Sequence, residues 1–253
     1  TMTSYVNMYG HVYYNAEHIP IRMERNIPYT FESQASGAED RVIGINDANK
    51  ITSLGDLAPH DVELIDLSAC KMLTEVKLGD SASDYVNYSL TSATFGENTL
   101  LRKVDLRNCV SYAQVPDLSR CVNIEEVYAE RSAITGINLP NGGVLKTLHL
   151  PETVVSLQVI NQPKLTDFVI PSYGQITTLR LENAGALSNK ALEILNAIPA
   201  NSRVRALGFH YEAESGNEVK AFLNRLNTMR GLDENGNNTT YAQVSGSIHT
   251  VEV

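Results

Sequence analysis

The chain has little of several features that often indicate a protein's class. It has three cysteines in 253 residues, and none of them forms a C-x-x-C pair. A complete disulfide framework is therefore excluded, and reduced, buried thiols are expected. No apolar run approaches the roughly 18 residues that a membrane-spanning helix needs. The opening TMTSYVNMYG lacks the basic and apolar regions of a signal peptide.

Basic charge is also scarce. The chain carries 20 Lys and Arg against 29 Asp and Glu, a formal net charge of -9, and its basic residues are scattered. Binding to phosphates or to anionic lipid surfaces needs clustered Lys and Arg. We therefore expect no nucleic-acid partner and no membrane insertion.

What the chain does have is a repeated unit, apolar-x-x-apolar-x-apolar. It occurs as LTEVKL from Leu73, LRKVDL from Leu101, IEEVYA from Ile124, ITGINL from Ile134, LKTLHL from Leu145, VVSLQV from Val154, LTDFVI from Leu165 and ITTLRL from Ile176. A helical repeat would instead place apolar residues at i, i+3, i+4 and i+7. Pro and Gly in the gaps interrupt helix, so the unit predicts a short strand followed by a corner.

Two such units make a rung of about 20–23 residues, the length of a leucine-rich repeat coil. The pattern therefore predicts a mostly β chain with a few helices, folded over residues 50–210 as a right-handed parallel β-solenoid. The residues expected inside are Leu67, Leu78, Leu106, Leu139, Leu150, Val159, Ile170 and Leu181.

The residues between the inward positions should project outward from the strands. If alternate units share a face, one outward row holds Asp105, Tyr128, His149 and Val169. A second row holds Asn138, Gln158 and Arg180. A row of mixed polar and aromatic side chains suits a contact surface, so the first row is the candidate binding face.

Three regions are expected: an N-terminal β segment at 1–46 that acts as a cap or junction, the solenoid at 47–211, and a helix and strand cap at 212–253. Alternation in IPIRMERNIPYTFE predicts short strands near Ile19–Met23 and Tyr29–Phe31. The tyrosine-rich character of 1–46 suits a junction with a neighbouring element.

Two helices are expected in the C-terminal half. In LSNKALEILNAIP, Ser188 is the candidate N-cap, and one apolar face is expected to hold Leu187, Ala191, Ile194, Leu195 and Ile198. In SGNEVKAFLNRLNTMRG, Ser215 and Glu218 match a capping box, and the apolar stripe is expected to hold Val219, Phe222, Leu223, Leu226 and Met229.

The cysteines share one setting, L-x-x-C-x-x-apolar, at Cys70, Cys109 and Cys121. No His or second Cys lies at metal-ligand spacing, and no activating His accompanies them. We interpret them as buried spacers in the corners and expect no bound metal.

The repeat resembles that of irregular leucine-rich repeat proteins over most of the chain, and more distantly that of BspA-like bacterial surface proteins. It is similar to leucine-rich repeat modules in tail-associated structural proteins of gut-bacterial phages and prophages. The similar segments include SLGDLAPHDVELIDLSACKMLTEVKLGD, LLRKVDLRNC and QITTLRLEN. In such repeats Asn is usual at the cysteine position and Cys is a common substitute. The resemblance implies a non-enzymatic part of a larger virion assembly.

Other candidate chemistry is sparse. His210 lies near Glu212 and Glu214, but no third ligand follows at metal spacing, so a solvated loop is favoured. NYS at Asn87 and NNTT at 237–240 match glycosylation acceptors, which short sequences produce by chance. No G-x-S-x-G, H-E-x-x-H or P-loop pattern occurs.

The sequence therefore favours a non-enzymatic interaction module without cofactor, which presents a solenoid face to a protein or a surface glycan, in a virion or at a cell surface. The alternative is a bacterial cell-surface adhesin or secreted binder. A glycan-acting enzyme is the third hypothesis, but it requires paired carboxylates that the sequence does not reveal.

Overall fold

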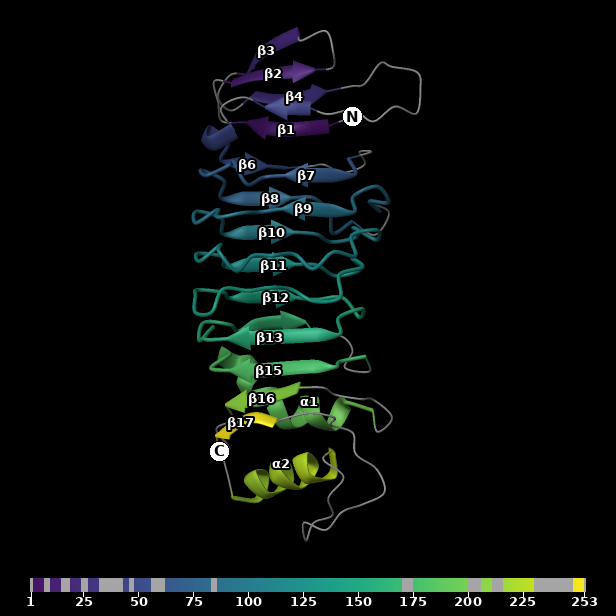
Figure 1. Ribbon diagram of the computed structural model, residues 1–253, viewed down its shortest axis with the longest axis vertical. Helices are drawn as coiled ribbons and strands as arrows, with labels where there is room; N and C mark the ends of the chain where they lie inside the picture. The colour runs from purple at the N-terminus through teal and green to yellow at the C-terminus, as the bar shows by residue number, and fades with distance from the viewer. Residues whose placement is uncertain are drawn as a thin grey trace.

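The computed structural model describes the backbone of residues 2–6, 10–14, 19–23, 27–31, 43–45, 48–55, 62–82, 86–169, 175–199, 206–210, 216–229 and 248–252. Side chains are described within 48–55, 62–82, 86–169, 175–199 and 216–229. Most of the chain winds into a parallel β-solenoid of about five turns, stacked along the long axis (Figure 1). The expected mostly β fold is confirmed.

Six parallel strands form one side of the coil, which we call the first wall. They are β6 (Ser53–Leu54), β8 (Glu75–Lys77), β10 (Lys103–Asp105), β11 (Glu126–Tyr128), β12 (Thr147–His149) and β14 (Asp167–Val169). The last four begin at residues 103, 126, 147 and 167, which are 23, 21 and 20 residues apart. This spacing confirms the predicted rung length.

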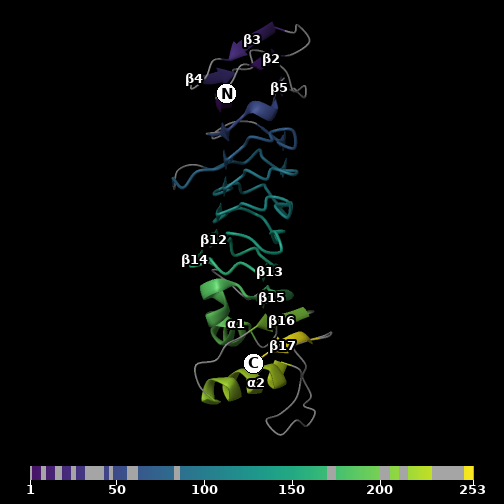
Figure 2. The same cartoon turned by 90° about the vertical axis from the view of Figure 1, so that its left-hand side faces the viewer.

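The opposite side, the second wall, holds β7 (Leu64–Asp66), β9 (Ser92–Thr94), β13 (Ser156–Ile160), β15 (Thr178–Glu182), β16 (Ala206–His210) and β17 (Ile248–Glu252). All their pairings are parallel. Between β9 and β13 the wall continues only as isolated bridges, Asp117 with Asn138 and Gly136 with Ser156. β12 and β14 lie on one side of the coil and β13 and β15 on the other (Figure 2).

Antiparallel strands precede the solenoid. β1 (Met2–Val6) pairs with β4 (Ile27–Phe31), and β2 (Gly10–Tyr14) pairs with β3 (Ile19–Met23) and β5 (Ile43–Ile45). A 3-10 turn, η1 (Ala48–Lys50), leads into the first coil. The predicted N-terminal strands are confirmed.

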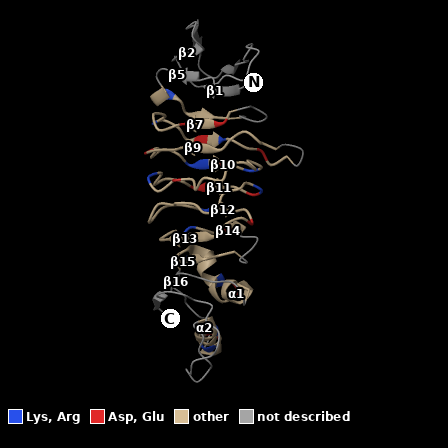
Figure 3. Ribbon diagram, turned by 45° about the vertical axis from the view of Figure 1, so that its right-hand side comes forward, with Lys and Arg blue, Asp and Glu red and all other residues tan. Residues whose placement is uncertain are grey.

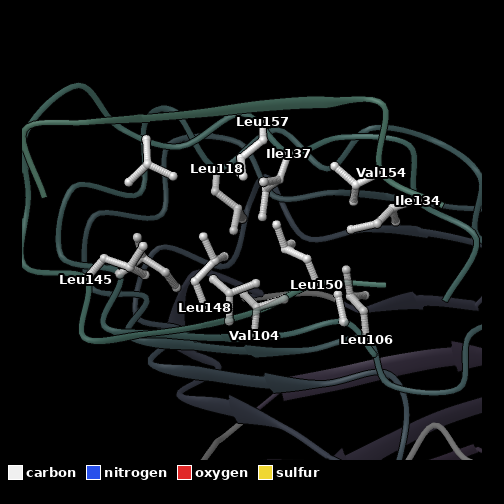
Figure 4. Packing of buried hydrophobic residues seen from close by; sticks show 14 of the residues in the cluster. Val104, Leu106, Leu118, Ile134, Ile137, Leu145, Leu148, Leu150, Val154 and Leu157 are labelled. Carbon is white, nitrogen blue, oxygen red and sulfur yellow. The ribbon is translucent and has the colours of Figure 1, made fainter. Parts of the chain in front are cut away.

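The core lies between the two walls and is mainly aliphatic (Figure 4), with Phe95, Tyr112 and the three cysteines among its buried members. Of the eight residues expected inside, six are buried: Leu67, Leu78, Leu106, Leu150, Val159 and Leu181. Leu139 is partly buried and packs against the core. Ile170 lies outside the described residues. The 1-4-6 apolar pattern thus correctly identifies the inward positions.

The corners use one recurring turn. In each cysteine corner, the Cys N–H donates to the carbonyl three residues earlier, and the residue three later donates to the Cys carbonyl. Asn87 and Cys109 occupy the same place in neighbouring coils and both donate to the Leu78 carbonyl, from Nδ2 at 3.3 Å and from Sγ at 3.5 Å. Cys109 therefore occupies its corner as Asn87 does in the neighbouring coil, and the turn that all three cysteines share fits their expected role as buried corner spacers. Asn87 is buried and so is not an exposed glycosylation acceptor.

Asn98 and Gln162 also fill corners of the coil, a role that was not predicted from the sequence. Asn98 donates to the Leu67 carbonyl at 3.0 Å. Gln162 accepts from the Leu145 N–H at 3.2 Å and donates to the Pro140 carbonyl at 2.8 Å. The longer Gln reaches across the turn of the neighbouring coil because Gly143 there has no side chain; a Cβ at Gly143 would lie 3.0 Å from Gln162 Oε1.

All three thiols are free and buried, which predicts slow chemical labelling. Burial raises the pKa of Cys109 to about 12 and that of Cys121 to about 11, and it also raises the pKa of Cys70. Because the thiolate is the reactive species, labelling with a thiol reagent at pH 7 should be slow in the native protein and fast in denaturant. Rapid labelling of the native protein, or stoichiometric zinc in a pure sample, would contradict the spacer role.

The two α-helices lie at the C-terminal end. A 3-10 turn, η2 (Gly185–Lys190), precedes α1 (Ala191–Ala197). Ser188 is therefore not the N-cap of α1, and that prediction is wrong: the helix begins after Lys190, and Ser188 Oγ instead accepts from the Ala184 N–H. The apolar face predicted for this helix is buried throughout.

The second helix, α2 (Gly216–Met229), buries Phe222, Leu226 and Met229 of the predicted stripe, and Val219 is partly buried. The prediction is wrong at Leu223, which is 41% exposed. Its Arg225 donates to the carbonyls of Leu195 and Ile198 at 2.9 and 3.0 Å. A cation at the carboxyl end of α1 satisfies carbonyls that the helix leaves free. The candidate capping residue Ser215 lies outside the described residues.

Candidate functional site

The structure aligns the predicted binding row on the first wall. Asp105 lies beside Tyr128, Tyr128 beside His149, and His149 beside Val169 in the parallel register. The second predicted row is aligned as well, because Gln158 lies beside Arg180. The division of outward residues between two faces, inferred from spacing alone, is confirmed.

The predicted binding row on the first wall is less accessible than the sequence suggested. The Asp105 side chain is 3% exposed, because Arg107 lies over it. Arg107 Nε donates to both carboxylate oxygens, at 2.9 and 3.1 Å, and the Arg107 backbone N–H donates to Oδ1 at 3.0 Å. Asp105 points away from the core, as expected, but it is not accessible to a ligand.

Tyr128 continues the same stack of side chains. The Arg107 guanidinium lies 4.9 Å from the centre of its ring, within cation–π range. On the other side His149 meets it edge-on, with ring centres 5.2 Å apart. The Tyr128 hydroxyl hydrogen-bonds Glu126 Oε2 at 3.2 Å. Arg107, Tyr128 and His149 therefore join three successive coils.

His149 lies between two carboxylates from different coils. Nδ1 is 2.8 Å from Glu130 Oε1, and Nε2 is 3.0 Å from Asp167 Oδ1. A neutral imidazole has one N–H and can donate to only one of them, whereas the imidazolium donates to both. Burial lowers the pKa of His149, but hydrogen bonds to Asp167 and Glu130 outweigh it, so the pKa lies above 6.5.

This arrangement predicts that the fold loses stability as pH rises through the folded-state pKa of His149. Because that pKa is raised, the stabilising contribution is complete below the unfolded value of 6.5 and disappears above the folded value. The free energy of unfolding should therefore fall more between pH 6 and pH 9 for the wild type than for His149→Gln. Parallel pH profiles for the two proteins would contradict the prediction.

Charged residues surround the row and pair with one another. Lys103 Nζ lies 3.5 Å from Glu75 Oε1 and 3.8 Å from Glu126 Oε2. Glu125 accepts from Lys146 Nζ at 2.5 Å and also from Arg102. Figure 3 shows this mixture of basic and acidic segments around β10 and β11, whereas β13 carries no charge. Exposed pairs of this kind contribute little stability, but they occupy the polar groups of the first wall.

The second wall offers a different outward row. Asn138 pairs with Asp117 of the preceding coil. Gly136 pairs with Ser156 of the next coil, and the same parallel register, two residues further on, places Asn138 beside Gln158. Asn138 and Gln158 are exposed, and neither side-chain amide has a hydrogen bond to a residue that the structure describes. These side chains are open to a ligand, unlike the side chain of Asp105 in the first wall.

One structural residue was missed by the sequence analysis. Tyr112 is buried, and its hydroxyl accepts from the Ala93 N–H at 3.2 Å and donates to the Ala93 carbonyl at 3.3 Å. The Tyr112 hydroxyl thus satisfies the backbone N–H and carbonyl of Ala93 in β9, at the point where no described neighbouring strand of the second wall pairs with them. The side chains of His210, Glu212 and Glu214 lie outside the described residues.

Among the described residues no group of three or more His, Cys, Asp or Glu side chains is arranged so that it could hold a metal ion, and no helix is long and apolar enough to cross a membrane. Comparison with protein-family models, with curated proteins and with solved structures found no match. The resemblance to leucine-rich repeat and phage tail modules therefore stays a hypothesis.

Proposed function

We propose that this chain is a non-enzymatic interaction module that presents a lateral wall of its solenoid to a glycan or to another protein. The observation that carries the proposal is the registered row of outward side chains over an aliphatic core, seen on both walls. In a solenoid each coil contacts its neighbours, so the walls stay free while the ends are covered.

The test uses the purified chain on a broad glycan array, with product analysis of every glycan that binds. Saturable binding without cleavage supports the module. Cleavage of a bound glycan would instead establish the enzyme hypothesis. An absence of binding to any glycan on the array and to isolated phage tail proteins would overturn the proposal.

The biological setting is a further part of the proposal and rests on the sequence resemblance. We place the module in the tail region of a phage or prophage virion, beside other structural proteins. Genes for tail proteins beside the gene of this chain would support this setting. A signal peptide and a cell-wall anchor encoded upstream would favour the alternative of a bacterial surface adhesin.

A further inference from the structure

We infer that the ligand is an uncharged, hydroxyl-rich glycan chain, and that it binds along the second wall at a surface that we call the amide strip. The strip consists of Asn138 and Gln158, flanked by Val115. This inference rests on the proposed function and goes further by choosing the wall and the class of ligand.

The first argument concerns hydrogen bonding. The carboxylate, guanidinium and imidazole groups of the first-wall row are already paired, Asp105 with Arg107 and His149 with Glu130 and Asp167. The amides of Asn138 and Gln158 are exposed and have no partner among the described residues. Each amide offers donors and an acceptor, which match a sugar hydroxyl, itself a donor and an acceptor.

The second argument is geometric. The two amides project from neighbouring coils, which are separated by about 4.8 Å in a parallel ladder. Val115 lies close to the buried Gly136: its Cγ2 is 3.9 Å from the position that a Cβ on residue 136 would take. The Val115 side chain is 38% exposed. A chain that crosses the strands can therefore place successive hydroxyls on the amides and its C–H surface on Val115.

The third argument is charge. β13 carries no charged residue. On one side of the strip Arg180 pairs with Glu182, and on the other side Asp117 accepts from the Ser119 N–H at 3.0 Å and keeps its negative charge. The net charge of -9 disfavours an anionic polymer. The strip itself holds no Trp, Tyr or Arg, the residues that dominate the energetic centres of protein interfaces, and Arg180, which lies beside Gln158, is paired with Glu182.

The experiment compares three proteins on an array of neutral and anionic glycans: the wild type, Asn138→Ala/Gln158→Ala, and the first-wall control Lys103→Ala. The substituted side-chain amides make no hydrogen bond to any residue that the structure describes, so thermal unfolding should show that the double variant folds normally. We expect the wild type to bind a neutral glycan, the double variant to bind it at least tenfold more weakly, and Lys103→Ala to bind within twofold of the wild type.

The outcomes separate this inference from the broader proposal. Neutral-glycan binding that survives in the double variant overturns the amide strip but leaves an interaction module. Binding restricted to anionic glycans or to a protein overturns the choice of ligand. An absence of binding to every glycan and to isolated tail proteins overturns both.

Discussion

Leu150→Ala is expected to lower the free energy of unfolding by about 2–5 kcal/mol, as buried leucines do when truncation leaves a cavity. Leu150 is fully buried, and it points into the core shared by both walls (Figure 4). Each coil packs on its neighbours, so the surrounding side chains have little freedom to close the cavity. Chemical denaturation of the two proteins measures the difference.

The matched control is Val169→Ala in the next first-wall strand. Val169 is 40% exposed, so its truncation removes little buried area and should change stability by less than about 1 kcal/mol. Equal losses in the two variants would show that Leu150 does not lie in a closely packed core.

Tyr112→Phe is expected to lower the free energy of unfolding almost as much as Leu150→Ala does, although it removes a single oxygen atom. The change leaves the buried Ala93 N–H and carbonyl without their partner, and each unsatisfied group costs about 1–3 kcal/mol. Burial raises the pKa of Tyr112 to about 12, so the hydroxyl keeps its proton and both hydrogen bonds at neutral pH. Denaturation at pH 7 measures the loss.

Tyr128→Phe provides the comparison for Tyr112→Phe. Its hydroxyl meets Glu126 near the surface, where water replaces the lost hydrogen bond. Hydrogen exchange adds a specific readout, because the Ala93 amide should exchange faster in Tyr112→Phe and not in Tyr128→Phe. Unchanged protection of Ala93 would contradict the assigned role.

The inward residues could be predicted because strand alternation is a local property of the chain. Leu106 and Leu150 follow the 1-4-6 pattern wherever the coil turns, and the same alternation aligned Tyr128 with His149. The corner cysteines were predictable for a similar reason, since the turn around them recurs with fixed spacing.

The accessibility of the site could not be predicted in the same way. Asp105 lies in the expected row, but Arg107 folds back over it, and rotamer choice is not visible in an alternating pattern. The contacts of Tyr112 with Ala93, and of His149 with Glu130 and Asp167, join different coils, so they depend on how coils of unequal length stack. The sequence alone therefore favoured a row in which the side chains of Asp105 and His149 are already paired.

The corner formed by Gln162 has an evolutionary consequence. Its amide occupies space that is open because Gly143, in the preceding coil, has no side chain. We therefore expect the two positions to be coupled: a side chain at 143 would require Gln162 to move from its hydrogen-bonded place or a shorter residue at 162. Coils of such a solenoid therefore cannot be exchanged freely between related chains, because the corner side chain of one coil has to fit the turn of the coil beside it.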